Sequence, residues 1–185
     1  NEATSSVQKK GTKTVLAAAA AMAFAGAACA EDINYSQTEN NSGYQSTAEN
    51  KTREFAADDK LIMNITGAAT RAYGLLATGK GTQFTNKGTI ELNTATENAA
   101  PYYMIKGMMA DNGGTAINEG VIDLNNAYGM TVGSTGTNKI VNKGTINVAG
   151  STFAAGMEIA PTGAAGTIPG ANAVGENAGT INVTH

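Results

Sequence analysis

Tryptophan is absent from this sequence, and aromatic residues make up only 5% of it, although hydrophobic residues reach 42%. Ordinary globular cores obtain much of their buried area from large aromatic side chains. Here the apolar share comes mainly from alanine, with isoleucine, valine, leucine and methionine. Proline occurs only three times, whereas glycine occurs 23 times. This composition favours many short strands joined by tight turns over a bulky globular core.

Charge is also scarce, because charged residues make up 15% of the chain and about a quarter is usual. The formal net charge is −3, and removal of residues 1–30, with three lysines and one glutamate, would bring it to −5. A nucleic-acid surface needs clustered lysine and arginine. We therefore expect no nucleic-acid partner.

Cysteine and histidine each occur once, as Cys29 and His185. A disulfide needs two cysteines, and zinc sites are built largely from cysteine and histidine. Histidine-based acid–base chemistry has no candidate other than the last residue. We expect no catalytic residue, no metal site and no cofactor, and we predict that the chain is not an enzyme.

Residues 1–30 predict an N-terminal extension with a cleavable secretory signal. A basic segment with Lys9, Lys10 and Lys13 precedes an uncharged helical run over residues 15–28, and Ala28 and Ala30 form an A-x-A cleavage site. The run is shorter than the roughly 20 residues that a membrane span needs. A buried alanine-rich helix and a lipoprotein site at Cys29 are weaker alternatives, since Gly26 stands where a lipoprotein signal usually has leucine.

The main internal signal is a repeated heptapeptide, N-x-G-[TV]-I-[EDN]-[LV], which begins at Asn86, Asn118, Asn142 and Asn177. A degenerate copy over residues 60–67 aligns Met63 with Ile146. Apolar residues alternate with polar ones, so one side of each strand should face a core. The predicted core positions are Met63, Ile65, Ile90, Leu92, Ile122, Leu124, Ile146, Val148, Ile181 and Val183.

Each copy opens with an asparagine and a glycine that suit a turn. Asparagine tolerates the left-handed region and bonds to nearby backbone, and glycine permits a tight turn or a positive φ. Stacked at one level, the asparagines could form a ladder. The predicted turn and ladder residues are Asn86, Gly88, Asn118, Gly120, Asn142, Gly144, Asn177 and Gly179.

Two further strand-like segments separate the heptapeptides. One is the Tyr-Gly type at residues 72–77, 127–132 and 154–159, with a looser relative at 103–109, and the other is the short apolar pair before each asparagine. Three short strands in about 24 residues match one rung of a parallel β-helix. We predict an all-β, right-handed parallel β-helix of about four rungs over residues 60–185, with residues 31–59 as a polar linker or cap. An antiparallel sandwich and a β-roll remain alternatives.

Two patterns resemble chemical sites. Residues 74–80 match the first seven positions of a P-loop, but Gly81 stands where magnesium binding needs serine or threonine. Glu91 and Asp123 occupy equivalent outward positions, as acids do in β-helix lyases and hydrolases, but the next equivalents are Asn147 and Asn182. A β-helix turn and a solvated face, respectively, explain the two patterns better.

The signal, the polar segment and the N-x-G-T-I-x-V repeats together resemble the passenger region of autotransporter (type V secretion) proteins of Gram-negative bacteria, over about residues 9–185. The resemblance implies secretion machinery as a partner and display at the cell surface, the outer membrane or outside the cell. It implies membrane contact only through the signal or through a C-terminal barrel that this sequence does not contain. Since the sequence ends in a strand-like segment, we expect it to be part of a longer gene product.

This resemblance favours a non-enzymatic adhesin or structural stalk, with a host or bacterial surface ligand as a further partner. The main alternative is the N-terminal part of a β-helix carbohydrate-active enzyme, a lyase or a hydrolase. A third is a self-associating surface protein with an open strand edge near residues 180–184.

Overall fold

The computed structural model describes residues 41–46, 50–65, 72–94, 105–133, 135–150, 154–159 and 173–184. All regular secondary structure in these residues is β-strand. The predicted signal, with Ala28 and Ala30, lies outside the described residues, as does His185.

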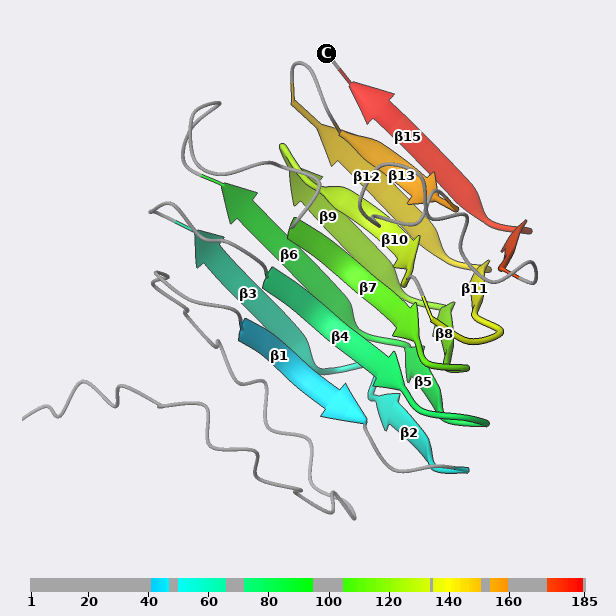
Figure 1. The fold of residues 1–185 in the computed structure, drawn as a ribbon. Helices are drawn as coiled ribbons and strands as arrows, with labels where there is room; N and C mark the ends of the chain where they lie inside the picture. The colour runs from blue at the N-terminus through cyan, green and yellow to red at the C-terminus, as the bar shows by residue number, and fades with distance from the viewer. Residues whose placement is uncertain are drawn as a thin grey trace, which may run out of the picture.

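The strands form three parallel sheets of five strands each (Figure 1). Sheet A contains β1 (Asn41–Ser46), β4 (Ala72–Thr78), β7 (Ile105–Asp111), β10 (Tyr128–Val132) and β13 (Ala155–Glu158). Sheet B contains β2 (Thr52–Phe55), β5 (Gln83–Asn86), β8 (Thr115–Asn118), β11 (Lys139–Asn142) and β14 (Val174–Asn177). Sheet C contains β3 (Lys60–Ile65), β6 (Thr89–Thr94), β9 (Val121–Asn125), β12 (Thr145–Ala149) and β15 (Thr180–Thr184).

The chain visits sheets A, B and C in turn, so one strand from each sheet makes one rung of a solenoid. Every pairing between neighbouring rungs is parallel, and equivalent positions of the repeats lie side by side, as Ile122, Ile146 and Ile181 do. The prediction of an all-β parallel β-helix is confirmed.

The first rung begins earlier than the repeats alone predicted. The repeat spacing gave about four rungs from Lys60, whereas each sheet has five strands. The difference comes from β1 and β2, which pair with β4 and β5. These two strands lie within the segment 31–59 that was predicted to be a linker or cap.

The alignment of the degenerate repeat was wrong by two residues. Leu61, not Met63, pairs with Ile90, and Met63 pairs with Leu92. A strand has a side-chain period of two, so a shift of two residues keeps the same face inward. Met63 is therefore still buried, and Leu61 is an additional core residue that the alignment missed.

The core is a column of stacked aliphatic side chains enclosed by the three sheets. It contains Leu61, Ile90, Ile122 and Ile146 from sheet C, together with leucine, methionine, alanine and valine side chains from sheet A. Sheet B contributes Phe55, Phe84, Ala116 and Ile140. Because each rung buries its apolar face against the next one, the fold needs few aromatic residues.

Glycines in sheet A make room for the isoleucines of sheet C. A Cβ built on Gly129 would lie 2.8 Å from Cγ2 of Ile146 and 2.2 Å from the carbonyl oxygen of Gly156. The same relation holds between Gly107 and Ile122. Within one rung, the glycine of the Tyr-Gly strand thus leaves space for the isoleucine of the N-x-G-T-I strand.

Candidate functional site

A ladder of asparagine side chains runs through four rungs at the end of sheet B, and its first three members are buried. Each Nδ2 donates to Oδ1 of the asparagine in the next rung, over 2.7 Å from Asn86 to Asn118, 2.8 Å from Asn118 to Asn142, and 2.8 Å from Asn142 to Asn177. The same Nδ2 atoms lie 3.3 Å from the carbonyl oxygens of Val121, Thr145 and Thr180. The ladder therefore joins sheet B of one rung to sheet C of the next.

The ladder stops in the first rung because Phe55 occupies the position equivalent to Asn86. Oδ1 of Asn86 is buried there without a hydrogen-bond partner. An unsatisfied buried oxygen costs free energy. Phe55 thus marks a real end of the ladder within the described rungs.

The glycines of the heptapeptide are required by close backbone approach. Gly88, Gly120, Gly144 and Gly179 are not among the described residues with positive φ. A Cβ on Gly144 would lie 2.1 Å from the carbonyl oxygen of Gly120, and one on Gly179 would lie 2.1 Å from that of Gly144. The rungs can stack at this corner only if the side chain is absent, so of the two predicted reasons for glycine, a tight turn or a positive φ, the second does not apply.

Most of the predicted core residues are buried. Those that the structure buries are Met63, Ile90, Leu92, Ile122, Leu124, Ile146 and Val148. Ile181 is partly buried, and the prediction fails for Val183, which is 55% exposed because no described rung covers β15. The side chain of Ile65 lies outside the described residues.

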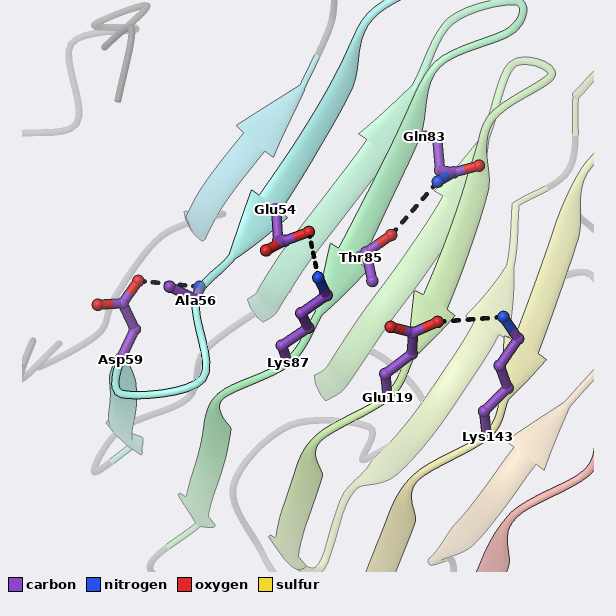
Figure 2. A network of polar contacts seen from close by, with 8 residues as sticks. All are labelled: Glu54, Ala56, Asp59, Gln83, Thr85, Lys87, Glu119 and Lys143. Carbon is purple, nitrogen blue, oxygen red and sulfur yellow. Dashed lines mark hydrogen bonds and ion pairs between the residues drawn. The ribbon is translucent and has the colours of Figure 1, made fainter. Parts of the chain in front are cut away.

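Opposite charges alternate along the corner between sheets B and C (Figure 2). Nζ of Lys87 lies 2.8 Å from Glu54, and Nζ of Lys143 lies 3.0 Å from Glu119. The hydrogen bond to Glu54 and its negative charge raise the pKa of Lys87. These exposed pairs link successive rungs, but each contributes little stability because water and salt screen it.

The outer face of sheet C carries a second, solvent-facing ladder. Nδ2 of Asn182 donates to Asn147 over 2.8 Å, and Nδ2 of Asn147 donates to Oδ1 of Asp123 over 2.7 Å. Asp123 pairs in register with Glu91, which is bonded to Lys60 over 2.9 Å and to Asn93 over 3.1 Å. The outward positions that the sequence analysis singled out therefore form one continuous row.

One carboxylate of this row, Glu91, is poorly suited to act as a general acid. Hydrogen bonding to Lys60, and then to Asn93, lowers the pKa of Glu91. A general acid at neutral pH needs a raised pKa instead. Glu91 and Asp123 are each held by a polar neighbour as part of the sheet surface.

A hollow of about 470 Å³ opens on the same face, near β12. Its lining residues are Asp123, Leu124, Asn147, Val148, Ala149, Asn182 and Thr184. Two of these residues, Leu124 and Val148, are buried core residues. Ala149 stands between Asn125 and Thr184 in its row and is the shortest side chain there.

The outer face of sheet A carries a polar and aromatic cluster that the sequence analysis missed. Lys106 is only 1% exposed, and its Nζ lies 5.8 Å from the ring centroid of Tyr73. Burial raises the pKa of Glu158, an effect that Lys106 opposes, and burial followed by the charge of Glu158 raises the pKa of Tyr128. The signal was available in the aligned Tyr-Gly strands, where Lys106 takes the tyrosine position between Tyr73 and Tyr128.

The segment that resembles a P-loop is a strand followed by a turn. Gly74 to Thr78 belong to β4, and Gly79 and Gly81 adopt positive φ in the turn that leads to β5. In the described part of the chain no helix follows that could receive a phosphate at its N-terminus. This geometry agrees with a β-helix turn.

No protein-family model, curated protein or solved structure matches the chain. Among the described residues there is no group of three or more His, Cys, Asp or Glu side chains that could hold a metal ion. A search of the same residues finds no helix long and apolar enough to cross a membrane.

Proposed function

We propose that this chain is part of an exported bacterial surface protein, in which the β-helix acts as a stalk or adhesin segment. The observation that carries the proposal is the asparagine ladder, which joins four of the five described rungs to one another. A structure in which each repeat contacts only its neighbours extends in one direction. Such a body suits a spacer that holds a binding surface away from the cell.

The composition supports export. The basic segment, the uncharged run and the A-x-A site of residues 1–30 form a secretory signal pattern. The remaining residues contain no cysteine, so no disulfide has to form before or after transport. The ladder joins successive rungs by hydrogen bonds between side-chain amide groups, and such bonds need no metal or cofactor.

Export can be tested by expressing the full chain in a Gram-negative host, with fractionation and mass determination of the product. We expect the chain to leave the cytoplasm with Glu31 as its new N-terminus. The double variant Ala28→Phe, Ala30→Phe should accumulate uncleaved, because the cleavage site accepts small residues. Wild-type chain that stays uncleaved in the cytoplasm would contradict the proposal.

The stalk role has its own test. Insertion of the described rungs between a surface anchor and an epitope should move the epitope outward by about 4.8 Å per rung, the strand spacing of a sheet. A scrambled linker of the same length is the control. Equal epitope distances for the two inserts would argue against a rigid spacer.

A further inference from the structure

We propose that the hollow over Ala149 on sheet C binds a neutral saccharide. The proposal rests on the proposed function, since it gives the exported solenoid a ligand class. The hollow is of ligand size, because small-molecule sites commonly measure about 300 to 1,000 Å³. Its volume is about 470 Å³.

The shape of the hollow follows from one small side chain. In the outward row of β9, β12 and β15, Asn125, Ala149 and Thr184 are neighbours in register. Ala149 carries the shortest side chain of the three, and it lines the hollow together with Thr184. The Ala149 methyl group gives the floor of the hollow an apolar spot, which suits the C–H face of a sugar ring.

The polar wall of the hollow is an ordered row of donors and acceptors. Asn182 donates to Asn147, and Asn147 donates to Asp123. An amide has two N–H groups and the ladder uses one of them, so each asparagine keeps a donor for a hydroxyl. A carboxylate can accept from two hydroxyls at once, which makes Asp123 a fitting partner for a vicinal diol.

The spacing of this row also fits a chain of sugars. The three side chains lie on consecutive rungs, about 4.8 Å apart as neighbouring strands are. That distance is comparable to the length of one pyranose residue. A glycan lying along the solenoid axis would therefore meet an equivalent polar group at each sugar.

Charge decides between neutral and acidic glycans. Glu91 lies next to Asp123 in the same row, and Lys60 offsets only one of these two carboxylates. The sequence after residue 30 carries a net charge of −5. Anionic sugars would thus be repelled, which leaves neutral saccharides as the ligand class.

Titration calorimetry of the full chain tests this with hexamers of β-glucose, α-mannose and N-acetylglucosamine, and with oligogalacturonate as the acidic contrast. We expect at least one neutral hexamer to bind and oligogalacturonate not to bind. Absence of binding to all three neutral hexamers at about 10 mM, where Kd values of weak complexes lie, would overturn the proposal. Preference for oligogalacturonate would overturn it as well.

Two variants locate the site. Ala149→Leu fills the hollow and should weaken binding by at least about tenfold, a free-energy change of about 1.4 kcal/mol. Thr145→Leu is the matched control, because it adds a comparable side chain outward on the same strand but outside the lining. Asn182→Leu keeps the size of the side chain and removes its amide, and it should weaken binding similarly.

Binding that Ala149→Leu leaves unchanged would place the saccharide elsewhere and overturn the inference. The circular dichroism of each variant shows whether it has folded, and the exposed position of Ala149 favours this. A chain that is exported but binds no neutral glycan would leave the proposed function standing. A chain that binds glycan but is not exported would contradict the proposed function alone.

Discussion

Asn118 occupies the middle of the buried ladder, with one asparagine on each side. It accepts from Asn86 over 2.7 Å and donates to Asn142 over 2.8 Å, and it is fully buried. Stacked amides of this kind satisfy each other where water has no access. The ladder therefore stabilises the fold mainly because breaking it leaves buried groups unpaired.

Asn118→Ala should destabilise the protein by about 2–4 kcal/mol, since it leaves a donor on one neighbour and an acceptor on the other without partners. Urea denaturation followed by circular dichroism measures this. Asn177→Ala is the matched control, because Asn177 is exposed and ends the ladder, and it should cost less than about 1 kcal/mol. Equal losses for the two variants would show that the ladder does not act as a buried network.

Glu158 offers a test of burial on the outer face of sheet A. Its Oε2 is buried without a hydrogen-bond partner, and burial raises its pKa. A carboxyl whose pKa is higher in the folded state stabilises folding below its unfolded pKa. This contribution is lost as the pH rises through the folded pKa.

Glu158→Gln should therefore raise the Tm at pH 7, because folding of the wild type must there either bury a charged carboxylate or bind a proton. The gain should shrink as the pH falls below the ordinary glutamate range, because the wild-type side chain is then neutral too. Thermal melts of both proteins at pH 7 and at acid pH measure this. A Tm difference that does not change with pH would contradict a desolvation effect.

At the scale of the element, alternation along each heptapeptide strand separates core from surface. Ile146 is fully buried, whereas its neighbour Thr145 faces outward. Alternation predicted this from the sequence because side chains of a strand point to opposite faces. Met63 was correctly predicted to face inward although its register was wrong, because the error of two residues equals one full side-chain period of a strand.

Ile146→Asp should unfold the described rungs, because burial of an unpaired carboxylate costs several kcal/mol and stabilities of domains are about 5–15 kcal/mol. Thr145→Asp introduces the same charge one residue away on the outer face, so it should keep the fold. Far-ultraviolet circular dichroism and melting distinguish the two. Native-like spectra and melting for Ile146→Asp would contradict its inward position.

Sequence patterns were less informative where a feature depends on a neighbouring rung. The heptapeptide glycines were attributed to turn conformation, but the limit at Gly144 is the carbonyl oxygen of Gly120 in the rung before it. The cluster around Lys106 involves residues of sheet A that are far apart in sequence and weakly alike. Similarly, the hollow over Ala149 depends on side chains from three strands, and no single repeat contains it.

At the scale of the whole molecule, each rung depends on its neighbours for burial. Val148 and Val183 occupy equivalent positions, yet Val148 is 2% exposed and Val183 is 55% exposed. The difference is the presence or absence of a further rung in the described structure. Stability should then be close to a sum of rungs and rung-to-rung interfaces.

Removal of one whole rung tests this additivity. Asn118 and Asn142 are 24 residues apart and occupy equivalent ladder positions. Deletion of residues 119–142 joins Asn118 directly to Lys143 and brings β6 beside β12, β7 beside β13 and β8 beside β14. Equivalent side chains then meet, so we expect the shortened chain to fold.

The deletion should lower the urea m-value by about a quarter, since m scales with buried surface and one of four rung-to-rung interfaces is lost. Deletion of only residues 119–130 is the control, because it removes about half a rung and brings strands of different sheets to the same position. That variant should lose its β-sheet circular dichroism. If both deletions unfolded the protein equally, the rungs would not be interchangeable units, and the solenoid would fold as one indivisible core.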